Sequence, residues 1–280
     1  QIIHLRSAPL KVAEILRDEL FTKKSSIIMT SATLTRRGKA DSFRKEVGVD
    51  DADERVVKSP FDYQHNMQVR IMSDFPEPQS RDRSLYLKCL FLAIDMAARS
   101  MEGGTLVLFT NYADLEYCYH NLRNPWSKLG RSVYAQGQGF ARSELRSRML
   151  EEGDVLLLGA ESFWKGFDAK GSCLSQVILT RLPFENPGHP IMEAKTERLE
   201  AEGKSSFLEI TIPKAVIRFR QGIGRLIRSH TDMGDLLILD SRILHKRYGF
   251  HFLSELPNRD FKTEQMQEII GELELSLIHI

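Results

Sequence analysis

The sequence predicts an α/β protein with a mostly parallel sheet and helices on both faces. Apolar runs of strand length recur along the chain, at Met67–Met72, Thr105–Phe109, Val155–Leu158 and Leu174–Leu179. Segments with the apolar spacing of helices stand between most of these runs. Such alternation is typical of parallel sheets, because the connection between two parallel strands crosses over the sheet, usually as a helix.

The first predicted elements are a helix and a short strand. A proline in the first turn and apolar residues at helical spacing predict a helix over residues 9–21. The apolar run Ser26–Met29 predicts a strand that ends at the small polar residues of 30–34. The stretch from 36 to 78 is less regular and indicates one strand, Met67–Met72.

The middle of the chain has the most regular pattern. A long apolar helix is predicted from Arg83 to a pair of glycines, which commonly end helices. The strand Thr105–Phe109 and a helix over Ala113–Leu122 follow. A further helix over Ala141–Leu150 precedes the strand Val155–Leu158. Each strand in this part of the chain is therefore flanked by a helix that can cover one face of the sheet.

The C-terminal third has less regular spacing and ends in a polar tail. Its predicted segments are a proline-rich loop at 182–190, a helix at 191–202, a helix that Pro213 opens, and an apolar run at 236–240. We expect one domain over residues 1–280, with a core of about 7–257 and a polar tail over 258–280.

Composition limits the classes of partner. The chain has 280 residues, and 39 lysines and arginines against 38 aspartates and glutamates give a formal charge of +1. Nucleic-acid contacts must therefore come from local patches. The three cysteines lie far apart and lack the spacing of zinc or iron–sulfur sites. No apolar run reaches the length of a membrane span and no secretion signal is evident, so we expect a cytoplasmic protein with no membrane partner.

Polar side chains gather where predicted strands end. Four such segments are Thr30–Leu34, Thr110–Tyr112, Ala160–Asp168 and Asp240–Arg242. The carboxyl ends of parallel strands meet at one edge of a sheet, and α/β proteins bind their ligands there. We therefore expect the functional site at this edge.

The densest group of cationic side chains lies in and before Gln221–Arg228. Arg225 and Arg228 lie three positions apart, and Arg218 and Arg220 precede them. Guanidinium groups are planar, always charged and matched to phosphate oxygens. The alternative is a solvated basic helix face, but glycines at alternate positions weaken a helix and are poor choices for such a face.

These motifs and their order resemble the C-terminal motor domain of the XPD/DinG family of superfamily 2 helicases. The matching segments are 30–34, 109–112, 161–168, 221–228 and 240–242, and the resemblance covers residues 7–257 approximately. It implies a RecA-like domain from an ATP-dependent helicase that moves 5′ to 3′ on single-stranded DNA.

The resemblance implies two groups of residues at the nucleotide. Arg225 and Arg228 match catalytic arginines that reach ATP phosphates across a cleft, and an arginine finger contributes about 10³–10⁵ in rate. Gln221, Gly166 and Asp168 match positions that bind ATP or couple its state to the grip on DNA. An ordinary helix-capping or turn aspartate is the alternative for Asp168.

The resemblance also implies contacts with single-stranded DNA. The residues concerned are Thr30, Ser31, Thr110, Asn111 and Trp164. Hydroxyl and amide groups bind phosphate oxygens without sequence preference, and an indole stacks on bases. A packed aromatic side chain is an equally good interpretation of Trp164.

Some parts of a helicase motor are missing from the sequence. Neither a GxxxxGK[ST] phosphate loop nor an acidic metal-binding pair is found. Gly203-Lys204-Ser205 is no such loop, because Arg198 stands where its first glycine belongs. The family's iron–sulfur cysteines are missing too. We therefore expect ATP and Mg²⁺ to be bound mainly by an N-terminal RecA-like domain of the same parent chain, and this chain alone to be inactive.

Two other classes of function stay open. One is a non-catalytic nucleic-acid-binding module that keeps the RecA-like fold. The other is a nuclease related to the same family, which is a weaker hypothesis because no carboxylate cluster with the spacing of a metal site stands out.

Overall fold

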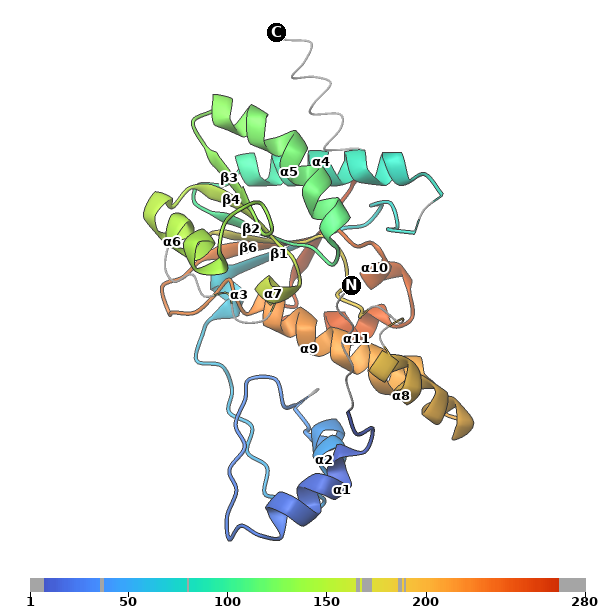
Figure 1. Cartoon of the computed structure of the whole chain (residues 1–280). Coiled ribbons are helices and arrows are strands. Elements are labelled where there is room, and N and C mark those ends of the chain that lie inside the picture. The colour runs from blue at the N-terminus through green and yellow to red at the C-terminus, as the bar shows by residue number, and fades with distance from the viewer. Residues whose placement is uncertain are drawn as a thin grey trace. The chain divides into compact units, whose positions relative to one another are not determined.

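The structure is a computed structural model, and it describes residues 8–35, 38–79, 81–164, 167, 173–185, 188 and 190–266. Contacts divide the chain into two compact units. The smaller unit combines Gln1–Ser59 with Phe184–Ile217, and the larger combines Pro60–Pro183 with Arg218–Ile280. The predicted sheet lies in the larger unit (Figure 1).

The sheet of the larger unit is entirely parallel in the described part of the chain. Seven strands lie in the order β3-β4-β2-β5-β6-β1-β7. They are β1 (Met67–Met72), β2 (Thr105–Leu108), β3 (Ser132–Ala135), β4 (Val155–Gly159), β5 (Gln176–Leu179), β6 (Gly234–Ile238) and β7 (Phe261–Glu264). The predicted α/β class with a parallel sheet is confirmed.

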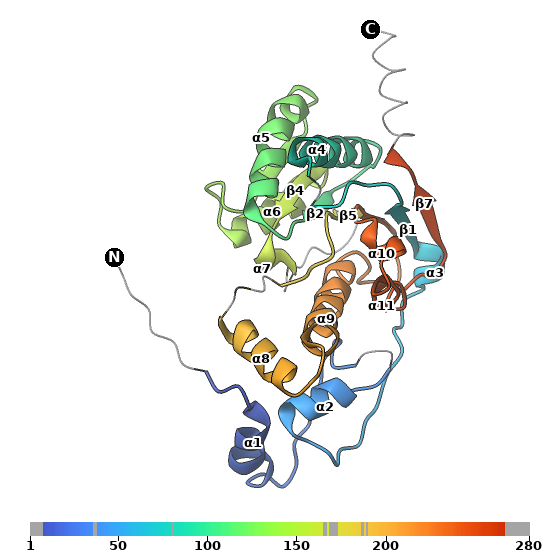
Figure 2. The same cartoon turned by 90° about the vertical axis from the view of Figure 1, so that its right-hand side faces the viewer.

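Helices cover both faces of this sheet. Figures 1 and 2 show α4 (Arg83–Arg99) and α5 (Tyr112–Lys128) on one face. On the other face lie α6 (Arg142–Glu152), α7 (Glu161–Trp164) and the C-terminal part of α9 (Ile212–Ile223). The unit also contains the short helices α3 (Tyr63–Asn66), α10 (Arg242–His245) and α11 (Gly249–Leu253).

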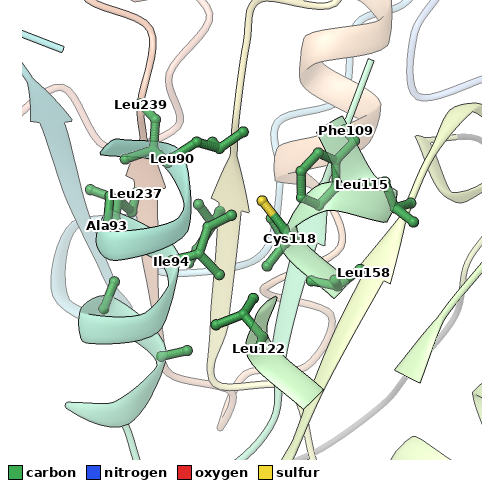
Figure 3. Close-up of a cluster of buried hydrophobic side chains, with 14 of the residues drawn as sticks. Leu90, Ala93, Ile94, Phe109, Leu115, Cys118, Leu122, Leu158, Leu237 and Leu239 are labelled. Atoms are coloured by element: carbon green, nitrogen blue, oxygen red, sulfur yellow. The ribbon is translucent and has the colours of Figure 1, made fainter. Parts of the chain in front are cut away.

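The core under α4 and α5 follows from the alternation of side chains along strands. Leu237 of β6 and Leu239, just after its end, lie on the side of the sheet that α4 covers (Figure 3). The helices contribute Leu90, Ala93 and Ile94 from α4 and Leu115, Cys118 and Leu122 from α5. All of these side chains are fully buried or nearly so. Burying one leucine stabilises the fold by about 1.5–3 kcal/mol, so each leucine of this cluster favours the packing of α4 and α5 on the sheet.

The last strand lies in the segment predicted as a polar tail. β7 pairs in parallel with β1, and none of its four residues is fully buried. Arg70 of β1 forms ion pairs with both strands that flank β1. Its guanidinium lies 2.6 Å from Asp235 of β6 and 3.2 Å from Glu264 of β7. An edge strand needs no apolar run, which is why composition alone did not reveal this one.

The regular elements of the smaller unit are helical in its described part. Its elements are α1 (Val12–Leu16), a π-helical segment (Arg17–Phe21), α2 (Asp41–Val47), α8 (Pro190–Ala201) and a second π-helical segment (Phe207–Thr211). The prediction of a strand at Ser26–Met29 is wrong. This segment belongs to no sheet in the described part of the chain, and the Ile28 side chain is 86% exposed. An apolar run becomes a strand only where another strand pairs with its backbone groups.

Candidate functional site

The two predicted catalytic arginines converge on one loop. They lie just after the end of α9. There the Gly224 N–H donates a hydrogen bond to the main-chain oxygen of Arg220. Arg225 donates from Nη1 to the main-chain oxygen of Phe167 at 3.0 Å and from Nη2 to that of Trp164 at 2.9 Å. Arg228 donates from Nη2 to the same Phe167 oxygen at 2.8 Å. Two guanidinium groups therefore share one carbonyl acceptor.

Among the described residues, the Arg225 guanidinium donates to main-chain oxygens. Both guanidinium acceptors described above are main-chain carbonyls, and no carboxylate pairs with Arg225 among the described residues. Its buried Nε meets no hydrogen-bond acceptor in that same part of the chain. Burial, and then the nearby charge of Arg142, lower the pKa of Arg225. A half-buried guanidinium can bind an anion, because an anion supplies a counter-charge and further hydrogen-bond acceptors.

Arg228 has an acidic neighbour that shapes its turn. Asp232 accepts hydrogen bonds from the main-chain N–H groups of Arg228 at 2.8 Å and Ser229 at 2.9 Å. Burial raises the pKa of Asp232, but these bonds and one from the Ser229 hydroxyl outweigh it, and the net shift is downward. Burial lowers the pKa of Arg228, an effect that Asp232 partly offsets. Asp232 is not among the residues expected from the sequence, although Ser-x-x-Asp is a recognisable turn pattern.

Two arginines of α6, Arg142 and Arg146, extend the cationic cluster and are also not among the residues expected from the sequence. The Arg142 guanidinium lies 5.8 Å from the Phe163 ring centroid, and Phe163 stacks on Phe167 at 4.8 Å. The charge of Arg146 lowers the pKa of Arg228. Their spacing of four residues could have indicated a shared helix face, but such a pattern is more often a solvated surface.

Trp164 is packed inside the larger unit. Its side chain is 1% exposed, and Nε1 donates to the main-chain oxygen of Phe109 at 2.8 Å. The ring lies against Gly222, where an added Cβ atom would come within 2.8 Å of the indole Cζ3. Of the two roles that the sequence leaves open for Trp164, the packed aromatic is the one seen in this conformation.

The end of β2 presents polar groups at the carboxyl edge of the sheet. Thr110 is half-buried there, and Asn111 caps α5 by accepting from the Asp114 N–H at 2.8 Å. The Asn111 amide also donates to the Asp114 side chain at 3.1 Å. Tyr112 is 48% exposed, and its hydroxyl accepts from Gln136 at 2.6 Å. Tyr112 thus presents an accessible aromatic ring beside Thr110.

Buried ion pairs hold the neighbouring strand ends. Asp114, which is 1% exposed, binds the guanidinium groups of Arg83 and Arg181. Asp240, 2% exposed at the end of β6, accepts from the Leu182 N–H at 2.7 Å and from Arg242 at 2.6 Å. Burial opposes the charge of Arg242, but Asp240 raises its pKa. These pairs fix the loops that follow β2, β5 and β6.

The remaining predicted residues are Gly166, Asp168, Thr30, Ser31 and Gln221. Gly166 and Asp168 lie outside the described residues. Thr30 and Ser31 belong to the smaller unit, where both are exposed and the Ser31 hydroxyl lies 3.2 Å from that of Thr33. Gln221 is half-buried on the last turn of α9, one turn before Arg225.

Residues 94–259, which include the arginine cluster and the β2 loop, match the family model of the helicase C-terminal domain. The chain belongs to this family. Within the family, the resemblance to XPD/DinG helicases is confirmed by relatives. The chain is 36% identical over 258 residues to the 3′–5′ exonuclease DinG of Bacillus subtilis strain 168, covering 91% of this chain and 28% of that protein.

Two other curated relatives carry helicase names. The ATP-dependent DNA helicase YoaA of Haemophilus influenzae is 32% identical over 96% of this chain and 41% of its own length. The ATP-dependent DNA helicase DinG of Photobacterium profundum is 33% identical over 90% of this chain and 37% of its own length. The chain therefore spans well under half the length of these helicase relatives.

Solved structures agree with this family membership at the level of fold. An XPD helicase superimposes with a TM-score of 0.57 at 16% identity, covering 71% of this chain and 35% of that one. The RecA-like fold expected of a helicase C-terminal domain is thus confirmed.

The described residues contain neither a metal-binding cluster nor a membrane-spanning helix. No group of three or more histidine, cysteine, aspartate or glutamate side chains within this part of the chain is arranged to hold a metal ion. Over the same residues, none of the helices combines the length and the apolar character needed to cross a bilayer.

Proposed function

We propose that this helicase C-terminal domain is the second motor domain of an ATP-dependent 5′–3′ DNA helicase. In this proposal Arg225 and Arg228 contact the phosphates of ATP bound on an N-terminal RecA-like domain of the same parent chain. The observation that carries it is the convergence of both guanidinium groups on the Phe167 carbonyl. The helicase names of two curated relatives support the same function.

The residues present fit a nucleotide phosphate. Arg225 lacks a carboxylate partner in the described part of the chain and carries a buried Nε without an acceptor there. Phosphate oxygens accept bidentate hydrogen bonds from a guanidinium and supply the missing negative charge. Arg225 and Arg228 would orient the terminal phosphates and stabilise charge that develops during hydrolysis. Mg²⁺ would be held by the N-terminal domain.

The same domain would form half of the track for single-stranded DNA. Thr110 and Asn111 follow β2 at the carboxyl edge of the sheet, and Tyr112 exposes its ring beside them. Thr30 and Ser31 supply hydroxyl groups on the smaller unit. Hydroxyl and amide contacts with phosphates carry no sequence preference, which suits a motor that moves along any DNA.

Arg225→Ala is the decisive variant. We expect it to lower the rate of DNA-stimulated ATP hydrolysis by about 10³-fold or more when the chain is joined to its phosphate-loop domain in one polypeptide. Arg148→Ala is the matched control, because Arg148 lies on the exposed face of α6 between Glu144 and Glu152. It should leave the rate within a factor of about two.

Two outcomes would contradict the proposal. One is steady ATP turnover by the chain alone that Arg225→Ala abolishes, because this chain would then hold its own catalytic site. The other is DNA binding without DNA-stimulated hydrolysis in the joined protein, which would favour a non-catalytic nucleic-acid-binding module.

A further inference from the structure

Trp164 forms hydrogen bonds with both halves of the proposed site. Its indole Nε1 donates to the main-chain oxygen of Phe109 at 2.8 Å, and Phe109 directly precedes Thr110. Its own main-chain oxygen accepts from Arg225 Nη2 at 2.9 Å. One buried residue therefore joins the arginine cluster to the loop that follows β2.

The indole ring also fits closely against the turn that carries Arg225. A Cβ atom at Gly222 would lie 2.8 Å from Cζ3 and 2.9 Å from Cε3 of Trp164, and 3.2 Å from a methyl group of Leu108. The Arg225 N–H donates to the Gly222 oxygen at 3.3 Å. Protein interiors are close-packed, so a movement of this turn must displace the ring or be blocked by it.

We propose that Trp164 is a positioning residue that couples nucleotide phosphates at Arg225 to single-stranded DNA at the Thr110–Asn111 loop. The inference rests on the proposed function and identifies the residue that links the nucleotide-binding arginines to the DNA-binding loop. Trp164 touches neither ligand in this proposal. It acts through the Phe109 carbonyl on one side and through its own carbonyl on the other.

The hydrogen bonds explain how the coupling would operate. When Arg225 turns toward a phosphate, the Trp164 carbonyl loses a donor, and a buried carbonyl must then move to find another partner. Trp164 is the last residue of α7, so this movement reaches the indole and, through Nε1, the Phe109 carbonyl. The effect is reciprocal, because binding at one site changes the affinity of the other by the same factor.

The test measures how strongly nucleotide changes DNA affinity. With the chain joined to its phosphate-loop domain, the dissociation constant for a single-stranded oligonucleotide is measured with and without a non-hydrolysable ATP analogue. Coupling between sites is commonly about 5- to 150-fold. Trp164→Phe keeps an aromatic ring but removes the indole N–H, and we expect it to bring the ratio of the two constants to within about twofold of 1.

Trp126→Phe is the matched control, since the chain has two tryptophans. Trp126 is also buried, and its Nε1 donates to Asp95 at 2.7 Å, away from the arginine cluster. Trp126→Phe loses the same kind of hydrogen bond. It should show the same ratio of DNA dissociation constants, with and without nucleotide, as the wild-type protein. Thermal unfolding of both variants compares their stability.

Different results overturn different claims. A Trp164→Phe ratio equal to that of the unchanged protein overturns the coupling role, as does an equal loss in Trp126→Phe. DNA binding weakened equally in both nucleotide states overturns it in favour of direct stacking of Trp164 on a base. Failure of the unchanged protein to respond to nucleotide at all overturns the proposed function itself.

A second variant covers the case in which Trp164→Phe does not fold. Gly222→Ala keeps tryptophan at position 164 but adds a methyl group that would lie 2.8 Å from its ring. We expect the same collapse of the nucleotide-dependent ratio, because the ring must shift away from the Arg225 turn. An unchanged ratio in a folded Gly222→Ala protein would overturn the inference.

Discussion

Arg225 and Arg148 differ in the acceptors that surround them. Arg148 lies between two glutamates on one helix face, which is an ordinary solvent-exposed arrangement. Arg225 donates to main-chain carbonyls, and in the described part of the chain it has no carboxylate partner. The sequence motif predicted that Arg225 matters, but only the structure identifies the Trp164 and Phe167 carbonyls as its partners.

The environment of Asp232 predicts that the free energy of unfolding depends measurably on pH in acid. Hydrogen bonds from the Ser229 side chain and from the N–H groups of Arg228 and Ser229 exceed the opposing effect of burial and hold its pKa below the unfolded value of about 3.9. The folded state therefore binds fewer protons than the unfolded state in acid. The stabilisation is present above that unfolded value and is lost as the pH falls through the folded pKa.

Asp232→Asn should therefore make the free energy of unfolding less dependent on pH in acid. Urea unfolding between about pH 5 and pH 2 would show a smaller loss of stability for the variant than for the unchanged protein. Asp154→Asn offers a comparison at an exposed carboxylate that pairs with Arg131. If Asp232→Asn and the wild-type protein lost the same unfolding free energy on acidification, Asp232 would not stabilise this turn.

Single elements show where sequence patterns succeed and fail. β1 matches its prediction because it is a compact run of mostly buried residues. β2, β4 and β5 also lie in predicted runs, since strands buried on both faces are continuously apolar. β3 and β7 lie at the two edges of the sheet and escaped prediction. Ser26–Met29 has the composition of a strand but no strand beside it.

The ion pairs of Arg70 join three strands and give a prediction about the sheet. Asp235 is 4% exposed and pairs with Arg70, which also reaches Glu264. Asp235→Asn removes a carboxylate charge beside the partly buried Arg70 guanidinium, and we expect a loss of about 3 kcal/mol in the free energy of unfolding. Lys262→Ala on exposed β7 should change it by less than about 0.5 kcal/mol.

Denaturant unfolding followed by circular dichroism measures both variants. A loss for Asp235→Asn no greater than that for Lys262→Ala would mean that Glu264 alone suffices to hold Arg70. In that case the three-strand ion pair would contribute little to the stability of this edge of the sheet.

At the scale of the whole molecule, a formal charge of +1 leaves DNA binding to local surfaces. Tyr112 combines an exposed ring with a position beside Thr110, so we expect it to stack on a base. Tyr112→Ala should weaken binding of single-stranded DNA by about 1–3 kcal/mol. Fluorescence anisotropy of a labelled oligonucleotide with the joined protein measures this change.

The salt dependence separates stacking from phosphate contacts. Log affinity should fall with log salt concentration by about 0.7 for each phosphate contacted, and Tyr112→Ala should keep that slope. Tyr134→Ala is the control, because that ring packs against Phe140 and its hydroxyl binds Glu152. A reduced slope in Tyr112→Ala, or equal weakening by Tyr134→Ala, would argue against a stacking platform at Tyr112.

The contact between Gly222 and Trp164 also restricts which sequences can form this fold. Any side chain at position 222 meets the indole ring, so residue volumes at the two positions are complementary. We expect the two positions to covary: a chain with alanine at 222 should carry a smaller residue at 164. Because the two positions are 58 residues apart in sequence, neither one read alone reveals the constraint.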